Sequence, residues 1–217
     1  MAPMAKENTN VQVRLENVRL SFAHVFRAQK PKPDKDGNVG AAKFNCSGLI
    51  DKKTEQGKKN IAKMKAAMTE ARDNKWPKNP PKLKPEKLCM RDGDQEDWDG
   101  YEGMYYVSAS NSKRPKIIDR DKTPLTEEDG KIYSGCYVNM IVNVWAQDNE
   151  HGRRINASLE GIQFVKNGEA FGAAPLDDDA FDDLGEGEDD DEENGGKPAR
   201  RGRSLDDDDD DGDDLLG

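Results

Sequence analysis

The chain has 217 residues, of which 33% are hydrophobic and 36% are charged, so only part of it is expected to form a packed domain. Residues 177–217 carry 20 acidic and 4 basic side chains, which leaves 30 basic and 24 acidic side chains in residues 1–176. The formal charge of −10 thus divides into −16 on the last segment and +6 on the body. The positive charge of the body favours a polyanionic partner and excludes a uniformly acidic domain.

The first half of the body predicts strands followed by one helix. Apolar and polar residues alternate over 11–26, which predicts one long strand with a bend after Asn17, or two short strands. Residues 29–40 are rich in turn formers, and 42–50 predict a second strand with a polar face. A helix is expected within 51–76, where Thr54 is a candidate cap, Trp76-Pro77 ends the pattern, and one stripe holds Ile61, Met64, Ala67, Met68 and Ala71.

The second half of the body predicts mainly strands. Residues 77–87 are expected to form an extended crossing loop, and 91–100 an acidic turn-forming loop. Strands are expected at 101–110, 133–147 and 153–165, the last two joined by a hairpin turn, with a short strand or extended edge at 113–119. About five strands with one helix in the middle predict a small closed or partly open β-barrel.

Strand 133–147 has one apolar and one mixed face. If the face of Cys136 fills the barrel, the side chains of Tyr137, Asn139, Asn143 and Trp145 point outward. Aromatic rings beside amides suit single-stranded nucleic acid, because every base has a face for stacking. The alternative is that these residues pack against the helix or a second subunit.

Aromatic, hydroxyl and cationic residues follow one another in strand 101–110 and just after it. Such a series suits a sugar-phosphate track; it comprises Tyr105, Tyr106, Ser108, Ser110, Lys113, Arg114 and Lys116. Cations on the other strands would extend it, namely Arg14, Arg19, Lys43, Arg153 and Arg154. Taken singly, each cation is better explained as an ordinary solvated charge, and only the whole set favours a phosphate track.

The sequence motifs give little support for a catalytic site or a metal site. The acidic loop 92–99 fails as an EF-hand, since Asp97 stands at the position that needs glycine and Gly103 at the position of the bidentate glutamate. The two histidines, His24 and His151, have no nucleophile motif near them. We therefore expect no enzyme activity, no metal and no cofactor.

The cysteines and the N-terminal region bear on the compartment. Cys46, Cys89 and Cys136 lie far apart without a C-x-x-C pair, which favours reduced thiols in a cytosolic compartment. The first residues hold no apolar signal region, and no stretch approaches the ~18 consecutive apolar residues of a membrane span. We expect neither secretion nor membrane insertion.

Two segments resemble a known family: LCMRDGDQEDWDGYEGMYYVSASNSKRPKIID and YSGCYVNMIVNVWAQDNEHGRRINASLEGIQFVKNGEAF. They are similar to the OB-fold single-stranded DNA-binding proteins of tailed bacteriophages, most specifically in R-D-G-D, A-S-x-x-x-R-P and Y-x-G-C-Y. The resemblance covers about residues 10–172 and implies a mainly β chain: a five-stranded, partly open OB barrel with one inserted helix and a DNA groove. By position, the resemblance implies that the groove residues of this chain are Tyr105, Tyr106, Lys113, Arg114, Tyr137 and Trp145.

The resemblance also implies an acidic C-terminal tail that contacts replication and recombination proteins. The expected organisation is a flexible N-terminus (1–10), an OB-fold domain (11–172) and a disordered acidic tail (173–217). The tail departs from several single-strand binding proteins by ending in Gly217 instead of phenylalanine, and it contains the basic island 199–203. Its expected partner-binding residues are Asp206, Asp207, Asp208, Asp213, Asp214, Leu215 and Leu216.

The favoured hypothesis is a non-enzymatic protein that coats single-stranded DNA without strong sequence preference in phage replication, recombination or repair. It would act in the host cytoplasm, with a tail that competes with DNA; duplex binding and a homo-oligomer are compatible with the sequence. The expected DNA-binding residues are Arg14, Lys43, Tyr105, Tyr106, Lys113, Arg114, Tyr137, Asn139, Trp145 and Arg154. The alternatives are an acidic interaction protein or DNA mimic acting on basic partners, and a metal-dependent nuclease using loop 92–99.

Overall fold

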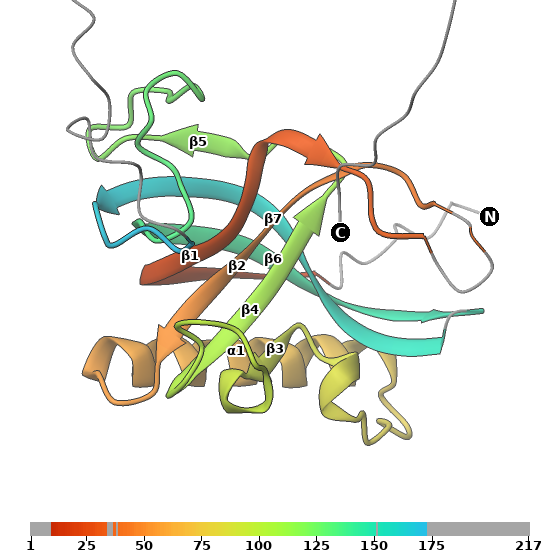
Figure 1. The fold of residues 1–217 in the computed structure, drawn as a ribbon. Coiled ribbons are helices and arrows are strands. Elements are labelled where there is room, and N and C mark those ends of the chain that lie inside the picture. Colours follow the sequence, from red (N-terminus) through yellow and green to blue (C-terminus); the bar gives the residue numbers. More distant parts are fainter. Residues whose placement is uncertain (1–9, 34–36, 38, 151, 173–217) are drawn as a thin grey trace, which may run out of the picture. The chain divides into compact units, whose positions relative to one another are not determined.

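The computed structural model describes residues 10–33, 37, 39–150 and 152–172 (Figure 1). This part of the chain is mainly β with a single α-helix. The elements are β1 (Val11–Gln29), β2 (Lys43–Asp51), α1 (Glu55–Lys75), η1 (a 3₁₀ turn, Pro85–Lys87), β3 (Met90–Asp92), η2 (a 3₁₀ turn, Gly93–Gln95), β4 (Met104–Asn111), β5 (Lys116–Ile118), β6 (Tyr137–Asn149) and β7 (Gly152–Lys166).

The strands form one sheet in the order β3-β4-β2-β1-β6-β7-β5, in which only the β5–β7 pair is parallel. The predicted number of five strands is wrong, because β3 and β5 also join the sheet. Strand β5 lies within 113–119, where a short strand or extended edge is expected, whereas β3 lies in a predicted loop; each has three residues, too few for alternation to identify it firmly.

The sheet curls without closing on itself. Strands β4 and β7 approach each other although no ladder pairs them within the described residues. At their junction the side-chain amide of Asn111 donates to the main-chain carbonyl of Leu159 at 3.0 Å. The architecture is therefore an open, barrel-like sheet. It agrees with the prediction of a partly open barrel in that the sheet is curved and does not close.

Strand β1 is one long strand, which is one of the two possibilities that the sequence leaves open, and it bends after Asn17 and once more. Its pairing with β6 shifts between Leu15 and Val18, and Asn17 between them has a left-handed φ of 52°. The buried side chain of Asn60 in α1 satisfies both main-chain groups of Glu16 at this irregularity: it accepts from the N–H at 3.2 Å and donates to the carbonyl at 2.8 Å. A second shift, between Ser21 and His24, bends β1 again.

Helix α1 begins and ends as its sequence predicts. The hydroxyl of Thr54 accepts from the N–H of Gly57 at 3.0 Å, which satisfies one of the free donors of the first turn. Glycine is required at position 57, because a Cβ there would lie 1.8 Å from the main-chain oxygen of Asp51. The helix packs beside β1 and β6 along the lower edge of Figure 1.

The main core lies between the inner face of the sheet and α1. It contains the alternating apolar residues of β6 and β1 together with Met64, Ala67 and Ala71 of the helix, so the predicted helical stripe is confirmed at these three positions. A smaller cluster, made of Leu49, Tyr101 and Tyr106 with Met104 and Phe171 against it, lies apart from this core. We call it the aromatic cluster, and with it we include the neighbouring rings of Phe22 and Trp98.

The predictions for the N-terminal residues 1–9 and for the acidic tail lie outside the described residues. His151 lies outside them as well. No helix in the described ranges is long and apolar enough to cross a membrane. Cys46, Cys89 and Cys136 are buried, and each has a free thiol.

Candidate nucleic-acid interface

A groove of about 680 Å³ runs where β4 and β7 approach each other; we call it the β4–β7 groove. One wall comes from the strands β1 to β4 and presents Phe22, Lys43, Asn45, Ser47, Arg91, Ser108 and Ser110. The other wall comes from the β6–β7 hairpin and presents Trp145, Gln147, Arg154, Asn156 and Ser158. Hydroxyl and amide groups therefore line much of the groove, between one aromatic ring on each wall.

The ladder registers explain why these side chains meet. On β2 and β4, Asn45 pairs with Ser110 and Ser47 with Ser108, so the four share one face. On the hairpin, Trp145 pairs with Asn156 and Gln147 with Arg154 on the outward face. The curl of the sheet turns these two outward faces toward a common space, which neither ladder alone predicts.

The charge of the groove favours an anion. Its lining includes the cations Lys43, Lys87, Arg91 and Arg154 but only one carboxylate, that of Glu86. Within the described residues none of these four cations forms an ion pair. Their charges are therefore available to phosphate groups, to which Lys and Arg supply most of the electrostatic attraction.

Trp145 is held in a fixed orientation on the hairpin wall. Its indole Nε1–H donates to Ser158 Oγ at 3.0 Å, and the ring stays partly exposed. The amide of the facing residue Asn156 donates to Gln147 Oε1 at 3.0 Å. A partly exposed ring fixed by a hydrogen bond beside amide groups can stack on a base while the amides contact its edge.

Three of the predicted DNA-binding residues line the groove: Lys43, Trp145 and Arg154. Two more, Lys113 and Arg114, are exposed and directly follow Ser112, which is the last lining residue of that segment. The guanidinium of Arg114 lies 5.5 Å from the centre of the Phe26 ring. These five remain candidates for contact with DNA.

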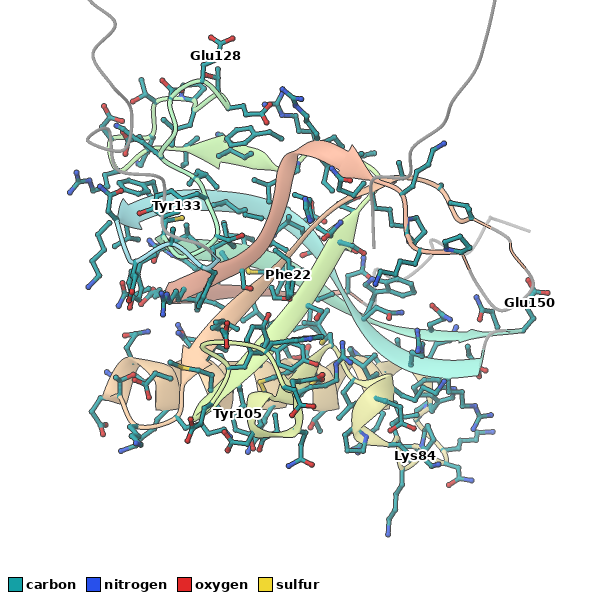
Figure 2. The ribbon with its side chains drawn as sticks, viewed as in Figure 1. Phe22, Lys84, Tyr105, Glu128, Tyr133 and Glu150 are labelled. Carbon is teal, nitrogen blue, oxygen red and sulfur yellow. The ribbon has the colours of Figure 1, made fainter. Side chains whose placement is uncertain are left out.

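The structure corrects the expected roles of the two tyrosines of β4. Tyr106 has 0% exposed surface, and its hydroxyl donates to the carboxylate of Glu96, so the ring offers no face to a base. Burial raises the pKa of this hydroxyl, and the bond to Glu96 adds to the effect. Tyr105 lies on the opposite face of β4, low in Figure 2 near α1, with the ammonium of Lys65 5.7 Å from its ring centre.

The remaining predicted residues lie outside the groove. Asn139 supports the first bend of β1, since its side-chain oxygen accepts from the N–H of Asn17 at 3.0 Å. The ring of Tyr137 lies under the ammonium of Lys166, at 4.6 Å. Arg14 is exposed, 3.8 Å from Glu16, and does not line the groove. The predicted tail residues 206–208 and 213–216 lie outside the described residues.

The prediction missed Phe22, Lys87 and Arg91. Nothing in the alternation of β1 marks Phe22 as a groove residue, because the bend between Ser21 and His24 redirects it. Arg91 was assigned to a loop, whereas it lies in β3. The alternation of strand 153–165 places Asn156 and Ser158 on the face of Arg154, so the sequence alone is enough to predict these two as groove residues.

The acidic loop after β3 is engaged in internal contacts. The ammonium of Lys52 bonds to Asp92 and, at 2.6 Å, to Asp94, whose other oxygen accepts from the N–H of Gly103 at 2.5 Å. The bond from Lys52 is the main reason why the pKa of Asp94 lies below its usual value. In the described ranges no three His, Cys, Asp or Glu side chains gather as a metal site.

Comparisons with known proteins identify the family of the chain and similar folds. The family model for the ssDNA-binding protein of Enterobacter phage Enc34 matches residues 11–194. Protein p50 of Acyrthosiphon pisum secondary endosymbiont phage 1 is 38% identical over 187 residues, which cover 82% of this chain and 97% of that protein.

Two solved structures are similar in fold. The single-stranded DNA-binding protein of bacteriophage Enc34, solved in complex with ssDNA, has a TM-score of 0.63 and 28% identity over 79% of this chain and 98% of its own. The single-stranded DNA-binding protein gp2.5 of bacteriophage T7 has a TM-score of 0.51 and 13% identity over 81% and 97%, which shows likeness of fold alone.

Proposed function

Because this chain belongs to the family of the Enterobacter phage Enc34 ssDNA-binding protein, we propose that it binds single-stranded DNA in the β4–β7 groove. The observation that carries the proposal is the joint presence in that groove of Trp145 and of cations that form no ion pair within the described residues. The sheet corresponds in this proposal to an OB-type barrel, and the bound strand runs between its two walls.

The groove separates two tasks. Lys43, Lys87 and Arg154 attract the phosphates, an interaction that is independent of base sequence. Trp145 stacks on a base, which is also sequence-tolerant, and stacking is worth ~1–3 kcal/mol per base. The protein therefore coats exposed strands without strong sequence preference and without catalysis, in phage replication, recombination or repair.

The acidic segment 177–217 has two roles in this proposal. Its charge of −16 competes with DNA for the basic body, and its end, with Leu215 and Leu216, binds replication or recombination proteins of the infected cell. A run of like charges repels itself and stays accessible to partners.

A fluorescence titration of labelled oligo-dT tests the binding site. Arg154→Ala and Arg14→Ala each remove one cation from an exposed position, but only Arg154 lines the groove. We expect Arg154→Ala to weaken binding and to reduce the slope of log K against log salt by ~0.7, and Arg14→Ala to leave both nearly unchanged. Equal effects of the two variants would place the strand elsewhere on the body.

Trp145 is tested in the same titration. Trp145→Ala is expected to lower affinity by about 5- to 150-fold, with Trp145→Phe as the matched variant that keeps an aromatic face. Circular dichroism checks that both variants fold. The titration is repeated with and without magnesium, and loss of the intact oligonucleotide only with the metal would favour a nuclease instead.

A further inference from the structure

Phe22 is the one member of the aromatic cluster that lines the β4–β7 groove. Tyr101 and Tyr106, at 1% and 0% exposure, form the base of the cluster, whereas Phe22 and Trp98 are 47% and 44% exposed. The rings meet edge to face: Phe22 and Trp98 have centroids 5.5 Å apart, and Trp98 and Tyr101 5.0 Å. Phe22 belongs to β1 (Figure 2) and therefore to the groove wall that comes from β1 to β4, whereas Trp145 belongs to the β6–β7 hairpin wall.

The backbone of Phe22 is strained, and burial does not compensate for the strain. Its φ is +49°, in the left-handed region, at the second bend of β1. A bulky side chain rarely adopts that region, and glycine or asparagine would form the same bend more easily, as Asn17 does at the first one. An aromatic ring kept half-exposed at such a position indicates a role other than packing.

Arg91, which has no anionic partner in the part of the chain that the structure describes, lies on the same wall. The guanidinium of Arg91 is 5.0 Å from the centre of the Tyr106 ring, and its Nη2 is 3.5 Å from Ser108 Oγ. Its Nε is buried and has no hydrogen-bond partner within the described residues. The rigid ring beneath it orients the guanidinium, which makes Arg91 suited to a phosphate next to Phe22.

We propose that Phe22 is a second base-stacking residue of the groove, on the wall opposite Trp145, and that Arg91 binds the phosphate beside the stacked base. This inference rests on the proposed function and adds a second anchoring point to it. Trp98 is a positioning residue, because its ring supports that of Phe22. The ligand must be a single strand, since bases inside a duplex are stacked on each other and have no free face.

The first test uses the full chain and three substitutions at position 22. Phe22→Leu keeps an apolar side chain but removes the aromatic face, Phe22→Ala removes both, and Phe22→Tyr keeps the face. We expect Leu and Ala to weaken oligo-dT binding by about 5- to 150-fold and Tyr to retain it. Wild-type affinity in Phe22→Leu and Phe22→Ala would overturn the proposal.

The second test needs no variant. Oligo-dT carrying 5-iodouracil is photo-crosslinked to the wild-type protein, and the modified peptides are identified by mass spectrometry. We expect separate adducts on the peptides that contain Phe22 and Trp145. Adducts at Trp145 without any at Phe22 would contradict the second stacking position.

The two proposals fail in distinguishable ways. If the wild-type chain does not bind oligo-dT at low salt, the proposed function is wrong. If it binds, and binding depends on Trp145 and Arg154 but not on Phe22, only this inference is wrong. Arg91→Gln should reduce the slope of log K against log salt by ~0.7, and Arg91→Lys should restore the wild-type slope. An unchanged slope in Arg91→Gln would rule out the phosphate contact of Arg91.

Discussion

At the scale of single residues, Asn60 shows how one side chain sustains a backbone irregularity. It is buried, at 1% exposure, and serves both main-chain groups of Glu16 at the first bend of β1. Asn60→Ala leaves the N–H and the carbonyl of Glu16 without these partners; because Glu16 is only partly buried, we expect about 1–2 kcal/mol for each. We expect the free energy of unfolding in urea to fall by ~2–4 kcal/mol, against less than ~0.5 kcal/mol for exposed Lys59→Ala.

The thiols are a second case at this scale. Burial is the main cause that raises the pKa of Cys46 and of Cys89, each to about 12, and it also raises the pKa of Cys136. All three should therefore stay protonated at pH 8, where the folded protein should resist Ellman's reagent while the urea-unfolded protein reacts at three thiols. Rapid reaction of any thiol in the folded state would show that the core opens at that cysteine.

Side-chain direction limits what sequence predicts at this scale. Both Trp145 and Tyr106 are predicted to contact DNA, but only Trp145 lines the groove, whereas the aromatic cluster buries Tyr106. The difference is that Trp145 faces an open groove, whereas Tyr106 faces Tyr101 and Trp98 from a separate loop. Alternation identifies the face of a residue but not what covers that face.

At the scale of elements, the acidic loop after β3 should be acid-sensitive. The bond from Lys52 lowers the pKa of Asp94, so ionised Asp94 stabilises the folded state. This stabilisation is present above the ordinary Asp pKa and is lost as pH falls through the lowered pKa of Asp94 in the folded protein. Asp94→Asn should therefore lower Tm at pH 7, with a difference from wild type that shrinks below pH ~4. Thermal scans from pH 7 to pH 3 measure it.

A neighbouring carboxylate provides the control for this loop. Asp99 is exposed in the same segment, and Asp99→Asn should leave Tm and its pH dependence almost unchanged. A constant difference between wild type and Asp94→Asn over the whole pH range would show that the ionised pair with Lys52 does not stabilise the loop.

Elements differ in how well sequence identifies them. The helix was predicted with its cap because Thr54, the stripe through Met64 and the Trp76-Pro77 stop are local signals. The strands β3 and β5 were missed or left undecided, because three residues are held by neighbours in the sheet and not by their own pattern. The β6–β7 hairpin was predicted because its two long strands alternate clearly.

At the scale of the whole molecule, charge division gives the clearest prediction. Deleting residues 177–217 changes the formal charge from −10 to +6 and should tighten oligo-dT binding by about tenfold near 50 mM salt. Screening should make the gain vanish toward ~0.5 M salt. Salt titrations of both proteins measure it, with a third variant in which serines replace residues 206–211. If the truncated protein binds no more tightly at low salt, the tail does not compete with DNA.

The alternating strands, the capped helix, the opposite charges of body and tail, and the family can all be predicted from the sequence, because period, composition and motif are local properties of the chain. The set of side chains that share the groove depends on how distant strands are arranged in space. The two walls of the groove meet where β4 approaches β7, a pair that no ladder joins within the described residues, and Phe22 and Arg91 reach the groove through a bend and a three-residue strand. Alternation assigns each residue to one of two faces, whereas the curl of the sheet decides which outward faces meet.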